Sequence, residues 1–181
     1  MVKPKVTVTE KGKDDWEKYA KAFKNMNKAY VTVGIHEGAG QYQGKNAPMV
    51  FEVALWNEFG TDRIPARPFM GLAIDGGMGK INAWREEAID KILNDGWSVQ
   101  KGLEMLGFRI QVLIQNKIKS NVPPPNAPST VKAKQKAGVL PKKFKEGTDN
   151  KGRPYSDRTK TLIDTGLMLR SVTYKVFVEK K

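Results

Sequence analysis

The chain has 181 residues, of which 39% are hydrophobic and 28% charged, a composition typical of a folded protein with one core. Cysteine is absent, which excludes disulfides, thiol catalysis and cysteine-ligated zinc, so we expect assembly in a reducing cytoplasm. No apolar run approaches the roughly 20 residues that span a bilayer, and the first residues lack the apolar core of a signal peptide, so no membrane partner is expected.

The net charge of +13 is unevenly distributed along the chain. Residues 1–100 hold 14 Lys and Arg against 13 Asp and Glu, whereas residues 101–181 hold 18 against 6. Residues 132–160 alone carry ten positive and three negative side chains, mostly lysines without regular aromatic residues between them. This pattern favours loose attraction to a nucleic-acid backbone or an acidic protein over base readout, and a solvated, self-repelling loop is the alternative.

The first half of the chain predicts a helix, a strand and two further helices. After a frayed arm or edge strand over residues 1–12, residues 14–28 predict a helix whose apolar stripe holds Trp16, Tyr19, Ala20, Phe23 and Met26. Residues 29–35 alternate as a strand does, and residues 36–46 form a polar, glycine-rich loop. A helix beginning at Pro48 and ending at Phe59 follows, then a glycine-rich break over residues 71–79 and a helix over residues 80–94.

The second half predicts the longest element, a helix over residues 98–120 with Ser98 as its N-cap. Pro123–Pro128 stops that helix as a stiff, extended spacer, and residues 129–160 form a long basic segment with little periodicity. A short helix over residues 161–169 and a strand over residues 171–178 close the chain. We therefore expect a single α+β domain over residues 1–181. It would have a small antiparallel sheet in which the last strand pairs with the first, and a flexible basic segment at about residues 122–160.

The most informative stretch is the connector, residues 57–70, which reads Asn-Glu-Phe-Gly-Thr-Asp-Arg-Ile-Pro-Ala-Arg-Pro-Phe-Met. Pro65 and Pro68 restrict the backbone, and Gly60 can adopt a positive φ that ends the preceding helix. The segment combines apolar anchors with two guanidinium groups. It is typical of a surface held in place for a partner, and a well-packed link between helices is the alternative interpretation.

Three parts of the chain form a pattern by their order and spacing. They are the strand Tyr30–Ile35 with its glycine-rich loop, the segment Val53–Thr61 running into Ile64–Phe69, and the C-terminal group Pro123–Thr130, Leu162–Gly166 and Ser171–Tyr174. Together they resemble the neck or tail-completion proteins of tailed bacteriophages. The resemblance covers about residues 30–178. It implies a structural virion protein of the head–tail junction that forms a six- or twelvefold ring around the DNA channel. The implied partners are the portal or connector and the tail-terminator or tail-tube proteins.

Residue roles follow from this resemblance as hypotheses. The subunit interface would use the connector residues Phe59, Arg63, Ile64, Pro65, Arg67, Pro68 and Phe69. Within it, the apolar residues would pack on the core and on a neighbouring subunit, and the two arginines would bond across the ring. Contacts with packaged DNA or a protein partner would come from Lys132, Lys134, Lys136, Lys142, Lys143, Lys145, Lys151 and Arg153.

A search for catalytic chemistry yields no constellation. The only histidine, His36, lacks an evident acid and nucleophile, and residues 75–80 fail the phosphate-loop pattern and are expected to be a loop leading into a helix. Glu86, Glu87 and Asp90 share a helix turn on an expected solvated face, and Asp164 is expected to cap a short helix with Gly166 beside it.

We therefore expect no enzyme, cofactor or metal. The alternatives are a tail terminator, a non-specific DNA-binding protein and, least supported, a metal-dependent nuclease.

Overall fold

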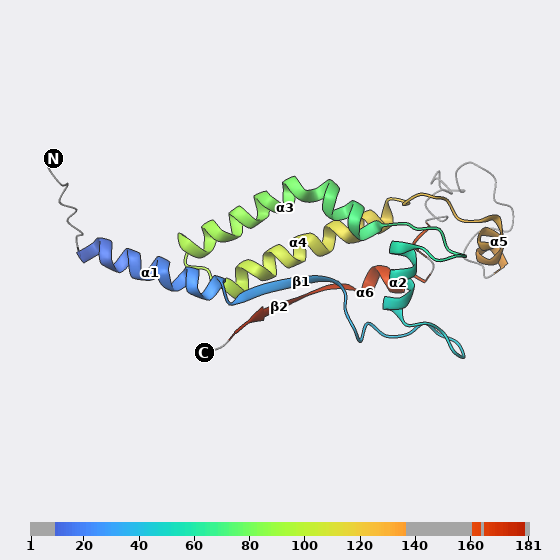
Figure 1. Ribbon diagram of the computed structural model, residues 1–181, viewed down its shortest axis with the longest axis horizontal. Coiled ribbons are helices and arrows are strands. Elements are labelled where there is room, and N and C mark those ends of the chain that lie inside the picture. The colour runs from blue at the N-terminus through green and yellow to red at the C-terminus, as the bar shows by residue number, and fades with distance from the viewer. Residues whose placement is uncertain (1–9, 137–160, 164, 180–181) are drawn as a thin grey trace, which may run out of the picture.

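An antiparallel ribbon of two strands lies along one side of a long helical hairpin in the computed structural model (Figure 1). The structure describes residues 10–136, 161–163 and 165–179. The ribbon consists of β1 (Ala29–Ile35) and β2 (Val172–Val178), and the hairpin of α3 (Phe69–Leu93) and α4 (Val99–Lys119). At one end α1 (Glu10–Met26) projects beyond this body, and at the other end lie α2 (Val50–Phe59), α5 (Pro128–Lys136) and α6 (Leu167–Ser171). The expected α+β class is confirmed.

The ribbon forms as the alternating sequence predicts, with the last strand paired to the first. Ala29 pairs with Val178 at one end of the ladder, and Ile35 pairs with Val172 at the other. One face of the ribbon packs on α4 at Gly107, where an added Cβ would lie 2.8 Å from atoms of both Val31 and Tyr174. Glycine at this position therefore allows helix and ribbon to approach each other closely.

The predicted break at residues 71–79 is wrong, because α3 runs without interruption from Phe69 to Leu93. With 25 residues it is longer than α4, which has 21, so the expectation that α4 is the longest element is also wrong. Gly77 is buried, and a Cβ there would collide with the Leu113 side chain of α4. Packing between the two helices thus compensates for the low helix propensity of glycine, which costs about 1 kcal/mol per residue relative to alanine.

The second helix of the hairpin matches its prediction closely. Ser98 Oγ accepts a hydrogen bond from Lys101 N at 3.2 Å, so Ser98 is the N-cap of α4. Ile114 and Ile118 are fully buried in the core, and the helix ends at Lys119, before the proline-rich segment. The core lies where α2, α3, α4 and β2 meet, and its largest fully buried side chains are Phe69, Ile114, Ile118, Val50, Val122 and Val172.

Several boundaries differ from the prediction. The second helix begins at Val50 rather than Pro48, because Glu52 Oε2 accepts from Met49 N at 2.7 Å and caps the helix start. Residues 128–136 form α5, although a segment without periodicity was expected there. The last helix covers Leu167–Ser171 rather than residues 161–169, with Gly166 at φ +75° before it.

Helix α1 begins earlier than predicted, and its apolar stripe divides into two faces. Tyr19 and Met26 are half-buried toward the body, where Tyr19 Oη lies 3.5 Å from Asn94 Oδ1. Trp16 and Phe23 are exposed over 72% and 53% of their surface. The expected arm over residues 1–12 lies mostly outside the described residues, and residues 10–12 belong to this helix.

Candidate subunit-interface surface

The connector between α2 and α3 is a tight turn that depends on Gly60. This glycine has φ +78°, and a Cβ on it would lie 2.9 Å from Ala66 N. Thr61 N donates to Ile64 O at 2.8 Å, and Ile64 N donates back to Thr61 O at 3.3 Å. The turn is therefore closed by its own backbone, and a side chain at position 60 has no space.

Glu58 fixes the connector from the helix side. Its carboxylate oxygens accept hydrogen bonds from Met70 N at 2.9 Å and from Gly71 N at 2.8 Å. These two amides belong to the first turn of α3, where backbone N–H groups lack partners within the helix and favour an anion. Sequence reasoning missed this role. The sequence does contain a signal for it. Glu58 lies in the last turn of α2, where the helix dipole disfavours a negative charge, so a partner for its carboxylate outside this helix is expected.

Arg67 fixes the connector from the other side. Its Nε donates to Pro124 O at 2.8 Å and its Nη2 to Pro125 O at 3.1 Å, and only 6% of the residue is exposed. Burial lowers the pKa of the Arg67 guanidinium below its ordinary value. The expected contact of Arg67 with a neighbouring subunit is corrected here, because its side chain bonds the proline-rich segment of its own chain.

The remaining predicted interface residues differ in burial. Phe69 is fully buried in the core of its own chain, which agrees with the expected packing on the core and corrects its assignment to a contact with a neighbouring subunit. Ile64 is half-buried. The other four predicted interface residues, Phe59, Arg63, Pro65 and Pro68, are exposed on the surface of the connector. Phe59 is the most exposed of the large hydrophobic residues described, at 76%. Their role in a subunit contact stays a prediction.

An apolar groove of about 570 Å³, which we name the α2 groove, lies beside Phe59. Its lining comes from α2, the end of β1 and the start of α3, and consists of Ile35, Glu37, Phe51, Ala54, Leu55, Glu58, Phe59 and Met70. Phe51, Leu55 and Phe59 are spaced four residues apart, so they share one face of α2. The charged residues in this lining are Glu37, which follows β1, and Glu58 of α2. The groove is thus apolar with an acidic rim.

The predicted basic contact residues are only partly described. Lys132 and Lys136 are exposed on α5. Lys134 is buried, and its Nζ donates to Ile163 O at 2.8 Å, which corrects its assignment as a contact for DNA or a partner. The other predicted contacts, Lys142, Lys143, Lys145, Lys151 and Arg153, lie outside the described residues.

His36 is a structural residue where the ribbon ends. Its Nε2 lies 2.9 Å from Thr32 Oγ1, and its Nδ1 lies 3.0 Å from Thr173 Oγ1, so it links the ends of the two strands. Burial lowers the pKa of His36 below its ordinary value, and the charge of Lys175 lowers it further. Both ring nitrogens of His36 therefore face threonine hydroxyl groups.

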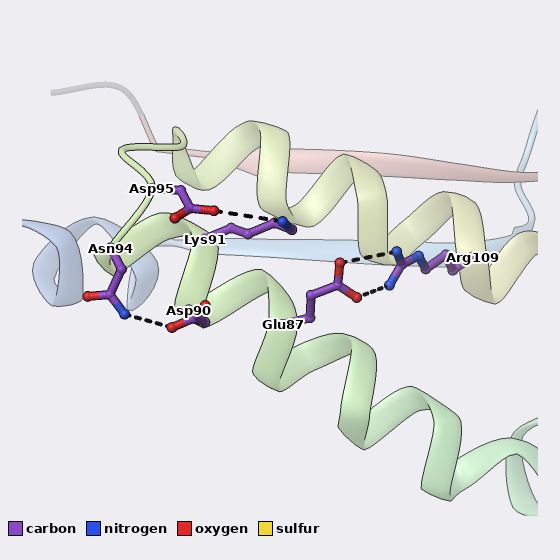
Figure 2. A network of polar contacts seen from close by, with 6 residues as sticks. All are labelled: Glu87, Asp90, Lys91, Asn94, Asp95 and Arg109. Carbon is purple, nitrogen blue, oxygen red and sulfur yellow. Dashed lines mark hydrogen bonds and ion pairs between the residues drawn. The ribbon is translucent and has the colours of Figure 1, made fainter.

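Two carboxylates of α3, Glu87 and Asp90, make polar contacts within the hairpin (Figure 2). Glu87 pairs with Arg109 of α4, with oxygen-to-nitrogen distances of 2.5 and 3.3 Å, and this hydrogen bonding lowers the pKa of Glu87. Asp90 accepts from Asn94 at 2.6 Å. Among the described residues, no group of three His, Cys, Asp or Glu is placed to hold a metal ion. Residues 75–80, expected as a loop, lie inside α3, and Asp164 lies outside the described residues.

Comparisons of the chain with family models, with curated proteins and with solved structures gave no match. The resemblance to phage neck and tail-completion proteins therefore stays a prediction from the sequence. None of the helices in the described ranges combines the length and apolar character needed to cross a membrane.

Proposed function

We propose that this chain is a structural subunit of the head–tail junction of a tailed bacteriophage, where it assembles into a ring. The single observation that carries the proposal is the connector. Glu58 and Arg67 fix this segment from both sides, and Phe59 stays 76% exposed beside an apolar groove. A rigid, exposed apolar surface of this kind is typical of a protein-binding site. The same segment is the strongest part of the resemblance to phage junction proteins.

The ring would join the DNA-filled head to the tail, with portal or connector and tail proteins as neighbours. Its function is assembly rather than catalysis. The exposed lysines of α5, Lys132 and Lys136, lie in the basic half of the chain and would attract DNA in the channel without reading its sequence.

The test starts from a phage whose genome encodes this chain. Its gene for the chain is deleted, and a lysate of the deletion phage is examined by electron microscopy. We expect DNA-filled heads beside separate tails of normal length, and recovery of virions when the chain is supplied in trans. Tails of abnormal length would indicate a tail terminator instead. Intact virions in the absence of the chain would overturn the proposal.

A further inference from the structure

A polar pocket of about 350 Å³ lies at the end of the ribbon where β1 ends and β2 begins. It joins two segments that the sequence analysis singled out outside the connector, namely the loop after the first strand and the C-terminal group that begins at Ser171. The polar side chains in its lining are those of His36, Glu37, Arg170, Ser171, Thr173 and Lys175, and the rest of the lining is a glycine and an alanine. The pocket therefore suits a polar ligand, unlike the α2 groove.

The pocket opens on the face of the ribbon that points away from α4. Side chains alternate between the two faces of a strand, so Thr173 and Lys175 share one face of β2, and Val172 and Tyr174 share the other. Val172 is fully buried and Tyr174 packs against Gly107 of α4, whereas Thr173 and Lys175 are exposed. A ligand can therefore reach the pocket without any movement of the helical hairpin.

Two cations in this lining, Arg170 and Lys175, are available to a ligand. Both residues are exposed, and within the described part of the chain neither side chain makes an ion pair or a hydrogen bond. Burial, and then the charge of Lys175, lowers the pKa of His36, so this ammonium group lies near the imidazole. An arginine and a lysine that lack acidic partners favour an anion between them.

One carboxylate, that of Glu37, opposes these cations. Glu37 makes no ion pair with either of them in the described part of the chain, and it also lines the α2 groove, so it lies at the border between two surfaces. Because the lowered pKa keeps His36 neutral near pH 7, the lining holds two cations against one carboxylate. The excess is positive, and Glu37 should weaken the binding of any anion.

The chemistry of the lining favours a phosphate group over a nucleobase or a protein surface. Guanidinium, ammonium and hydroxyl groups such as that of Ser171 are the donors that proteins use for phosphate oxygens. The lining holds no Phe, Tyr or Trp on which a base could stack, and it lacks the apolar centre that is typical of protein interfaces.

We propose that this pocket binds a phosphate group of the DNA backbone through Arg170 and Lys175. The inference rests on the proposed function, because DNA is the phosphate polymer that a head–tail junction encloses. It adds a defined contact to the exposed lysines of α5, and this contact attracts DNA without reading its sequence.

The experiment measures the binding of purified full-length chain to a short DNA duplex at several salt concentrations. The double variant Arg170→Gln/Lys175→Gln removes both cations of the pocket, and Lys21→Gln/Lys24→Gln is the control, which removes two exposed charges from α1. Loss of one phosphate contact should lower the slope of log affinity against log salt by about 0.9 and weaken binding about eightfold at about 0.1 M salt. The control should bind as wild type does, and Glu37→Gln should bind more tightly.

Two results of these measurements would overturn the proposal. One is a pocket variant that binds DNA with the affinity and salt slope of the wild type. The other is an equal loss in the control, which would show a general effect of net charge. Thermal unfolding of each variant should match that of the wild type, because the substituted side chains are exposed.

His36 provides a second readout that is specific to the pocket. It is the only histidine of the chain, so its ring signals in NMR report on this location alone. Duplex DNA should shift these signals in the wild type and leave them unchanged in Arg170→Gln/Lys175→Gln. A shift with inorganic phosphate and none with DNA would assign the pocket to free phosphate and overturn the DNA ligand. The absence of a shift with both would overturn the site.

Complementation of the deletion phage separates this site from the proposed function. If Arg170→Gln/Lys175→Gln binds DNA as wild type does but fails to restore virions, the pocket contacts an acidic protein and the DNA site is wrong. If the purified chains behave as expected but deletion leaves virions intact, the site stands and the junction function is wrong.

Discussion

Two aromatic side chains packed in the body contrast with three exposed ones at its two ends, although Tyr30 and Phe108 of the body are exposed too. In the body, Phe69 is fully buried, and Tyr174 packs where Gly107 leaves space for it. At the ends, Trp16, Phe23 and Phe59 each expose more than half of their surface. The body therefore holds the stability of the fold, and the ends keep surfaces that another chain can cover. Substitutions chosen in pairs, one from each region, test this difference.

The largest effect is expected for Phe69→Ala. Loss of a fully buried phenylalanine should lower the free energy of unfolding by about 3–5 kcal/mol, through lost burial and the cavity that remains. The exposed Phe59, ten residues earlier, should change stability by less than about 0.5 kcal/mol when replaced by alanine. Denaturant unfolding of the two variants measures the difference, and equal losses would contradict the division between body and ends.

Of the two arginines in the connector, the buried one should again contribute more to stability than the exposed one. Arg67→Ala leaves the carbonyls of Pro124 and Pro125 without their donors and should cost about 2–3 kcal/mol of stability. Arg63→Ala removes an exposed side chain and should cost less than about 0.5 kcal/mol. Thermal unfolding of both variants provides the measurement. A larger loss for Arg63 would show that the connector is not fixed through Arg67.

Glycines within the body sharpen the comparison. Gly107→Ala places a methyl group 2.8 Å from atoms of Val31 and Tyr174 and should cost about 1–3 kcal/mol. Gly79→Ala, on the open side of α3, should instead stabilise the protein by up to about 1 kcal/mol, because alanine favours the helix. We expect the denaturation midpoint to fall in Gly107→Ala and to rise in Gly79→Ala. A Gly107→Ala variant as stable as the wild type would contradict the close packing of α4 on the ribbon.

The smallest effect concerns pH and the single histidine. The pKa of His36 is lowered in the folded state, so the unfolded chain binds a proton more readily than the folded chain does. Its contribution to stability is therefore present above the ordinary histidine pKa of about 6.5 and is lost as pH falls through the lower folded value. The free energy of unfolding is measured for wild type and His36→Gln between pH 7 and pH 5 (about the range of histidine titration), and it should depend less on pH in the variant. The same dependence on pH in both proteins would exclude His36 as the cause of the loss of stability.

Periodicity predicted the elements that pack by a repeating pattern. Both strands and their pairing, the helix α4 and its Ser98 cap were all predicted from local patterns. The uninterrupted α3 was missed because the buried contact of Gly77 with Leu113 comes from a distant part of the chain. Local propensity could not reveal that this glycine serves helix packing.

The sequence indicated which segment to examine, but not which of its side chains are buried and which are exposed. The sequence singled out the connector, and the structure places Phe59 on its surface beside the α2 groove. Arg67 and Lys134 looked like free cations, yet both are buried and donate to backbone carbonyls far along the chain. Charge alone does not show whether a basic side chain serves an internal carbonyl or a partner.

The pairing of β1 with β2 has a consequence for the order in which the chain folds. The partner of Ala29 is Val178, so the first strand leaves the ribosome long before its ladder can form. Helices α3 and α4 are neighbours in sequence, and their hairpin can close early because it depends on local contacts. The side of α4 that faces the ribbon then stays partly exposed to solvent until β2 is synthesised. Chaperone binding to newly synthesised chains should therefore end only after β2 has become available for pairing.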